Sequence, residues 1–340
     1  MMATQAASPG SDHPLAAFGL DTVAHGAARL RADRVALAEA GRGAAAATTT
    51  YGELDRLTRA FSAQARACGL APGERMLILG APRICVAVAI LGALGAGLEP
   101  VIAPAHYSTA ALVYLAQSTD AAAIVGPTRF GDLDTESAML ETAATAPGIR
   151  LLGSLGPGAI DDAVDFSPSG LRDFMDMAPP NALTATPARI GLALAPDQKA
   201  PRVVFVAQCD IVAAALDFAS RLRLNAEQPI LSTLSPASFA GLAAGPVAAL
   251  LVGAPLILFG PFEAEGFIAA LDDAGPCHLV APEAIAADLA AAGLIAPGRL
   301  ESLSLAGRGA SAGAAIGAAR PVALLASDGQ GRMTISLAGA

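Results

Sequence analysis

The feature of this sequence that most limits its fold is a repeated alternation between short apolar runs and helical segments. The runs 75–79, 98–102 and 121–125 are dominated by apolar residues, and helical patterns at 82–94 and 108–117 separate them. Strands that are apolar on both faces are typical of a parallel sheet that helices cover on both sides. The alternation therefore predicts an α/β fold with doubly wound, mostly parallel sheets.

The alternation is interrupted once, which predicts two lobes. Between residues 131 and 188, acidic residues, proline and glycine concentrate and the apolar periodicity weakens, as is typical of a connecting segment. Strand and helix patterns resume after this segment, and we expect the two lobes to form one compact unit. The expected divisions are a disordered tail (1–20), a first α/β lobe (21–130), a connecting region (131–188) and a second α/β lobe (189–340).

Composition limits the partners and the compartment. The chain has 340 residues, 54% of them apolar, with no tryptophan, which predicts a large core of closely packed aliphatic side chains. The formal net charge is -9 and Lys and Arg form no cluster, so neither nucleic acid nor an anionic membrane surface is an expected partner. The four cysteines form no C-x-x-C pair and the N-terminus has no secretory signal pattern, so we expect reduced thiols and a cytoplasmic protein.

The segment 232–262 carries no charged residue and is long enough to span a membrane. Four prolines and several glycines interrupt it, which disfavours a continuous apolar helix. We therefore expect a loop, a helix over 241–252, a turn and a buried strand over 255–259, and no membrane span.

Thr50 and Glu53 predict the start of a helix. They fit a capping box, in which the Thr50 side chain accepts a hydrogen bond from the Glu53 amide and the Glu53 carboxylate reaches back to the Thr50 amide. Leu54 and Phe61 follow at helical spacing. Gly69 is expected just beyond the helix end, where a left-handed residue is favoured.

Six motifs follow one another along the chain. They are T-Y-G-E-L-D (50–55), G-L-A-P-G-E-R-M-L-I-L (69–79), L-G-A-L-G-A-G-L-E-P-V-I-A-P (91–104), L-L-V-G-A-P-L-I-L (250–258), E-A-E-G-F-I-A-A-L-D-D-A-G-P-C-H-L-V (263–280) and L-E-S-L-S-L-A-G-R-G-A (300–310). In order and spacing, over about residues 20–310, they resemble the large N-terminal domain of AMP-forming acyl-CoA synthetases, in the adenylate-forming (AMP-binding) superfamily. The resemblance implies two doubly wound lobes side by side.

The resemblance also implies a phosphate-binding loop, where the family carries a pattern close to T-S-G-T-T-G-x-P-K-G-V. This sequence has A-L-A-P-D-Q at 193–198 instead, so Pro196 offers no amide and Asp197 brings a negative charge toward a polyanion. We interpret the charged side chains of Lys199 and Arg202, which follow this segment, as solvated rather than as phosphate ligands. The residues of this degraded loop region are Ala195, Asp197, Lys199 and Arg202.

The acyl pocket and the nucleotide site of the family fall on altered residues. A family His that shapes the acyl entrance corresponds to Ser238, and a family Y-G-x-T-E, whose Glu holds magnesium, corresponds to S-D-G-Q at 327–330. No catalytic residue and no metal site is predicted, and we do not recognise the family's C-terminal domain with its catalytic Lys. The acyl-pocket-equivalent residues are Ser238, Gly241, Gly307 and Gly309, and the nucleotide-equivalent residues are Asp328 and Gln330.

Two glycine motifs suggest other enzyme classes. G-A-S-A-G at 309–313 matches a nucleophile elbow, but no histidine follows His278 to complete a triad in the hydrolase order. G-R-G-A-S-A at 307–312, with Asp328 downstream, fits a variant of the dinucleotide-binding pattern, but little sequence remains for such a fold. The histidines lie too far apart for metal-ligand spacing, so we interpret His106 as a surface residue and His278 as a bonded core residue.

Three functions remain open from the sequence. The leading hypothesis is a catalytically inactive, acyl-CoA synthetase-like protein that binds a ligand or a protein partner. The alternative is half of an AMP-forming carboxylate–CoA ligase whose C-terminal lid another chain supplies. The third is a component of a complex that uses an exposed lobe surface. No cofactor is assigned, and the ligands that the resemblance implies are ATP or AMP, CoA and acyl-CoA.

Overall fold

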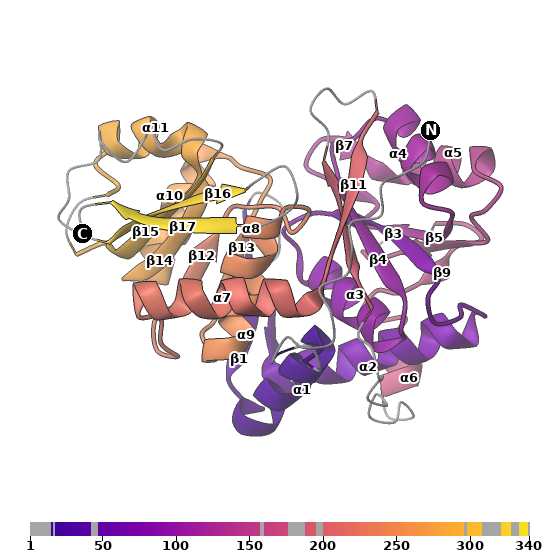
Figure 1. The fold of residues 1–340 in the computed structure, drawn as a ribbon, viewed down its shortest axis with the longest axis horizontal. Helices are drawn as coiled ribbons and strands as arrows, with labels where there is room; N and C mark the ends of the chain where they lie inside the picture. The colour runs from indigo at the N-terminus through magenta and orange to yellow at the C-terminus, as the bar shows by residue number, and fades with distance from the viewer. Residues whose placement is uncertain are drawn as a thin grey trace.

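The structure is a computed structural model that consists of two halves lying side by side, each built on one large sheet (Figure 1). Both sheets are largely parallel, which confirms the predicted α/β fold. The described residues are 15, 18–41, 47–156, 160–175, 188–194, 200–295, 298–307, 321–327 and 333–338.

The described strands of the first sheet run in the order β11–β10–β4–β3–β5–β8–β9. Neighbouring strands pair in parallel except β10 and β11, which are antiparallel. Helices α2 and α3 pack on one face and α4 and α5 on the other, because alternate residues of β3 belong to two different core clusters. The strands are β3 (Arg75–Gly80), β4 (Glu99–Pro104), β5 (Ala121–Gly126), β8 (Leu151–Ser154), β9 (Val164–Asp165), β10 (Ile190–Leu194) and β11 (Arg202–Val206). The helices are α2 (Tyr51–Ala67), α3 (Ile84–Gly95), α4 (Thr109–Ser118) and α5 (Thr135–Thr145), with α6 (Arg172–Met175) beside α2 and a small hairpin of β6 (Arg129–Phe130) and β7 (Leu133–Asp134).

The described strands of the second sheet run in the order β17–β16–β15–β14–β12–β13–β1–β2. Helices α7, α8 and α9 pack on one face and α10 and α11 on the other. Only the outer pairs, β16 with β17 and β1 with β2, are antiparallel among the described strands. The strands are β1 (Val35–Ala40), β2 (Thr48–Thr50), β12 (Ile230–Ser232), β13 (Leu256–Phe259), β14 (Cys277–Pro282), β15 (Leu300–Gly307), β16 (Val322–Ser327) and β17 (Met333–Ala338). The helices are α7 (Gln208–Leu222), α8 (Phe239–Leu242), α9 (Ala248–Val252), α10 (Ala264–Ala274) and α11 (Ala286–Ala291), with a single 3₁₀ turn (Glu283–Ile285) before α11.

The two sheets exchange segments across the boundaries expected from the sequence. Strands β1 and β2 come from the first 50 residues but join the second sheet, next to β13. The hairpin of β10 and β11 comes after residue 189 but joins the first sheet, next to β4. Strands β8 and β9, inside the expected connecting region, also extend the first sheet. Each sheet is therefore built from segments that are not continuous along the chain, and the domain limits stay a prediction.

The predicted helix start at Thr50 is confirmed in one of its two hydrogen bonds. The Thr50 hydroxyl oxygen accepts a hydrogen bond from the Glu53 amide at 3.2 Å and caps α2. The Glu53 carboxylate instead accepts a hydrogen bond from the Thr49 hydroxyl at 3.0 Å. At the other end, Gly69 has a φ of +83°, as predicted for the residue just beyond the helix.

The uncharged segment 232–262 is mostly buried in the second half, with Phe262 exposed at its end. The expected helix over 241–252 is present but irregular, because a π-helical turn (Ala243–Val247) that contains Pro246 separates α8 from α9. Proline lacks the amide of a regular helical hydrogen bond, which is a sufficient cause for the irregular turn. Strand β13 follows, as expected. No helix within the described ranges is long and apolar enough to cross a membrane.

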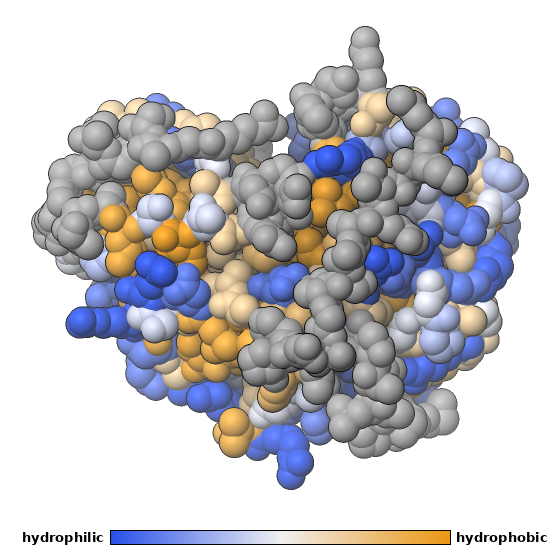
Figure 2. All heavy atoms as spheres, viewed as in Figure 1, coloured by the Kyte–Doolittle hydropathy of each residue, from blue (hydrophilic) through white to orange (hydrophobic). Residues whose placement is uncertain are grey.

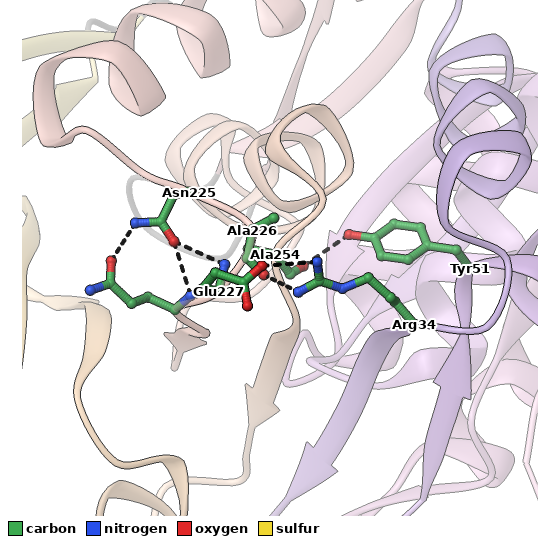
Figure 3. Close-up of polar contacts among 7 residues, drawn as sticks. Arg34, Tyr51, Asn225, Ala226, Glu227 and Ala254 are labelled. Carbon is green, nitrogen blue, oxygen red and sulfur yellow. Dashed lines mark hydrogen bonds and ion pairs between the residues drawn. The ribbon is translucent and has the colours of Figure 1, made fainter.

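Tyr51 fixes the junction between the two halves. Its buried hydroxyl lies 3.0 Å from the Ala249 carbonyl oxygen and 2.9 Å from that of Ala254, at the end of α9. Burial raises the pKa of Tyr51 to about 12, so the hydroxyl keeps the proton that it donates. Beside it, Arg34 donates hydrogen bonds to Glu227 and to the Ala226 carbonyl, as Figure 3 shows.

We predict that Tyr51→Phe lowers the free energy of unfolding by about 1–3 kcal/mol, because the Ala254 carbonyl loses the hydroxyl donor, while the Ala249 carbonyl keeps the amides of Gly253 and Ala254. The measurement is urea denaturation of the purified variant. Tyr114→Phe is the matched control, since Tyr114 is 45% exposed, and its effect is expected within about 0.5 kcal/mol. Equal stability of Tyr51→Phe and the parent protein would contradict the proposed role of this hydroxyl.

Candidate functional site

The segment 195–199, expected from the sequence to correspond to the family's phosphate loop, connects the two strands of an antiparallel hairpin. Strands β10 and β11 pair from Ile190 with Val206 up to Leu194 with Arg202, so the ladder continues to the residue before the loop. Tyr107 anchors this end of β10, since its buried hydroxyl donates a hydrogen bond to the Ala193 carbonyl at 3.1 Å. Arg202 is exposed at the first position of β11. Ala195, Asp197 and Lys199 lie outside the described residues.

Two arginines at the base of this hairpin are paired within the protein. The Glu99 carboxylate accepts hydrogen bonds from Arg75 Nε and Arg189 Nε, each at 3.2 Å. Both guanidinium groups also lie over the Phe205 ring, at 5.2 Å and 5.0 Å from its centroid. These contacts hold both guanidinium groups where β11 attaches to the sheet.

The acyl-pocket-equivalent residues of α8 are engaged in local contacts. Ser238 caps α8, because its hydroxyl oxygen accepts a hydrogen bond from the Gly241 amide at 3.0 Å. The same hydroxyl donates to the Ser235 carbonyl at 3.1 Å. Gly241 is buried, and a Cβ at this position would overlap the Ser235 carbonyl oxygen. The structure therefore brings Ser238 and Gly241 together, as a tight turn.

The other predicted site residues fall at the end of β15 and beyond it. Gly307 ends β15, and the Glu283 carboxylate fills the space that a Cβ on Gly307 would occupy. Gly309, Asp328 and Gln330 lie outside the described residues, as do the glycine motifs beyond Gly307. Within the described ranges, no group of three or more His, Cys, Asp or Glu side chains is arranged to hold a metal ion.

A pocket of about 190 Å³ opens between the two sheets. We call it the inter-sheet pocket. It lies at the carboxyl ends of β3, β4, β12 and β13, which is where ligands commonly bind in parallel α/β sheets. Sequence reasoning missed it, because its walls come from separate loops, and His106 was interpreted only as a surface residue. Its described lining residues are Gly80, Pro82, Ala105, His106, Phe130, Thr233, Ser235, Phe259, Gly260, Pro261 and Phe262.

The second half also carries apolar surface on its outer strands. Met333, Ile335 and Leu337 of β17 are only half-buried where they pack toward the core. Figure 2 shows apolar side chains gathered over this part of the second half. This face is a place where the hypothesis of a complex component could be tested.

His278 is a buried core residue, but only one of its ring nitrogens is bonded. Nδ1 lies 2.8 Å from the Ser302 hydroxyl, on the neighbouring strand. Nε2 and the Ser304 hydroxyl are buried and have no hydrogen-bond partner among the described residues. Burial lowers the pKa of His278 below its ordinary 6.5, opposed by the nearby Glu301 charge. The folded protein therefore holds this imidazole neutral.

We predict that acid destabilises the fold partly through His278. In the unfolded chain the imidazole takes up a proton as the pH falls through 6.5, whereas in the folded protein its pKa is lower. The free energy of unfolding therefore falls as the pH drops below that value. His278→Gln should lose less stability than the parent protein between about pH 7.5 and about pH 5.

The measurement is urea denaturation at a series of pH values. His106→Gln is the control, since it removes an exposed imidazole and should keep the pH dependence of the parent protein. A pH dependence of His278→Gln equal to that of the parent would show that His278 is not responsible.

Residues 24–169 match the family model described as AMP-binding enzyme. The chain is 33% identical over 132 residues to a salicyl-AMP ligase / salicyl-S-ArCP synthetase of Mycobacterium tuberculosis (strain ATCC 25618 / H37Rv), a match over 38% of this chain and 23% of that protein. It therefore matches less than a quarter of the length of this curated relative.

Solved structures match over almost the whole chain. The apo structure of MbtA from Mycobacterium smegmatis superposes with a TM-score of 0.77 at 25% identity, covering 94% of this chain and 58% of that one. A benzoate CoA ligase from Burkholderia xenovorans LB400 has a TM-score of 0.74 at 21% identity, covering 95% of this chain and 64% of that one. The chain thus spans about three fifths of the length of these two proteins, and the second likeness concerns the fold alone.

Proposed function

We propose that this chain is a member of the AMP-binding, adenylate-forming superfamily, which its matches to the family model and to MbtA support, and that it binds a ligand without adenylating it. The observation that carries the proposal is the sequence A-L-A-P-D-Q at 193–198, in place of a loop rich in Gly, Ser and Thr. Adenylation needs the phosphates of ATP held in line by amides, hydroxyls and cations, which neutralise the charge that develops in the transition state. The segment 193–198 contains no Gly, Ser or Thr, Pro196 has no amide to donate, and Asp197 adds a negative charge.

The surroundings of the loop support the same proposal. Ala193 and Leu194 pair with β11 in the ladder, and the Ala193 carbonyl also accepts the hydrogen bond from Tyr107. Arg75 and Arg189, the described cations at the base of the hairpin, are bonded to Glu99. These two arginines lie at the end of the hairpin opposite the loop, next to the Ile190–Val206 pair, so neither offers its charge to a polyanion at the loop.

The ligand class follows from the relatives and from the pocket. The names of the relatives specify salicyl and benzoate groups, which are aryl carboxylates, and the superfamily joins acyl groups to AMP or CoA. The inter-sheet pocket offers this chain a site for a small molecule. We therefore propose an acyl-, aryl- or CoA-type ligand, with binding rather than ligation as the activity.

We predict no ATP–pyrophosphate exchange above background with a panel of aliphatic and aromatic carboxylic acids. An adenylating relative assayed in parallel serves as the positive control. In the same preparation, calorimetric titration with CoA, acyl-CoA thioesters and aryl compounds should show binding of at least one of them.

Exchange above background would contradict the proposal. Exchange that appears only after a stand-alone C-terminal domain of the family is added would instead establish the alternative of a ligase completed by another chain. Absence of both exchange and binding would leave only a role in contacts with another protein.

A further inference from the structure

We propose that the ligand occupies the inter-sheet pocket and that the bound group is an uncharged ring or short branched chain, not a carboxylate. This inference rests on the proposed function and specifies its site and ligand class. It follows from three features: Ser238, Gly241 and Gly307 are in close contact with other parts of the protein, the inter-sheet pocket has the size of a single ring, and its described walls carry no Lys, Arg, Asp or Glu side chain.

The described acyl-pocket-equivalent residues are in close contact with other parts of the protein. Ser238 uses its hydroxyl as donor and acceptor within the turn before α8. The backbone of Gly241 lies against the Ser235 carbonyl, and that of Gly307 against the Glu283 carboxylate. A ligand placed against Gly307 would have to displace this carboxylate. The inter-sheet pocket needs no such displacement.

The walls of the inter-sheet pocket suit an aromatic or branched apolar group. Phe259 and Phe262 pack with Phe267 in one aromatic cluster, with ring centroids 5.2–6.0 Å apart. Phe262 stays 51% exposed at the pocket, so a ligand ring would remove its apolar surface from water. An apolar cavity of about 150 Å³ binds benzene, and this pocket has a volume of about 190 Å³.

The polar groups of the pocket fit a neutral ligand. The Ser235 hydroxyl already donates to the Gly80 carbonyl at 2.9 Å and accepts from the Ala237 amide at 3.1 Å. The Thr233 hydroxyl has only a long contact, 3.5 Å, with the Val280 carbonyl. Thr233 and the exposed His106 are therefore the side chains with hydrogen-bonding capacity to offer a ligand.

A carboxylate would lose hydration in this pocket without meeting a fixed cation. The described lining residues include no Lys or Arg, and the Arg83 guanidinium close by, next to the lining residue Pro82, is 2.8 Å from the Glu39 carboxylate. Loss of hydration without a compensating partner disfavours an ionised group. An amide, alcohol or ester of the same ring avoids this cost and can still bond Thr233.

The test compares salicylamide with salicylate, two rings of the same size that differ in charge at neutral pH. Binding to the purified chain is measured by calorimetry and by ligand-observed NMR. We expect salicylamide to bind about tenfold more tightly than salicylate. Salicylate binding as tightly as salicylamide, or more tightly, would overturn the proposal.

Variants locate the site. Phe262→Ala removes the exposed aromatic ring from the wall of the pocket. Thr233→Val removes the available hydroxyl and keeps nearly the same side-chain shape. Each variant should weaken salicylamide binding about fivefold or more. Phe18→Ala is the matched control, because Phe18 is 46% exposed at the start of α1 (Leu20–Arg31), outside the residues that line the pocket. Salicylamide binding that is unchanged by both pocket variants would overturn the proposed site.

The outcomes separate this inference from the proposed function. If an acyl-CoA binds but neither salicyl compound does, the ligand class proposed here is wrong while the proposed function stands. If no acyl-, aryl- or CoA-type compound binds the parent protein, both are wrong.

Discussion

The parallel pairing of β1 with β13 is the contact on which the rest of the structure depends. It places residues from the start of the chain in the second sheet, from Leu37 beside Leu256 to Ala40 beside Phe259. The chain then crosses at Tyr51 into α2, which covers the first sheet. The hairpin of β10 and β11 makes a second exchange, in the opposite sense. Neither half can therefore complete its sheet from one continuous stretch of chain.

This exchange of strands between the two sheets explains why the fold can persist when residues that bind phosphate are replaced. The sheets are held by apolar strands and by buried contacts such as that of Tyr51 with the α9 carbonyls. The ladder of β10 and β11 runs from Ile190 with Val206 to Leu194 with Arg202 and includes no residue of the loop 195–199. Substitutions in the loop can therefore remove phosphate-binding groups while the contacts between the two halves are kept. The same meeting of the halves forms the inter-sheet pocket, where Gly260 packs against Pro82.

The sequence was sufficient for local structure and insufficient for long-range contacts. The alternation of apolar runs predicted the α/β fold, and Thr50 predicted the start of α2, because both depend on neighbouring residues. The membership of β1 in the second sheet could not be read from its six residues, since strand pairing depends on distant partners. The inter-sheet pocket was missed for the same reason. For His278, the core position was predicted, but its single bonded nitrogen depends on Ser302, which lies 24 residues away.

The central claim is that an intact adenylate-forming scaffold has lost its hold on the triphosphate while keeping a ligand pocket. Calorimetric titration of the purified chain with magnesium–ATP tests this most directly, because it needs no acyl substrate and no catalysis. Heats equal to those of dilution are expected up to millimolar nucleotide, since the loop offers proline and aspartate where amides and hydroxyls would bind phosphate. Saturable binding at micromolar ATP would contradict the claim.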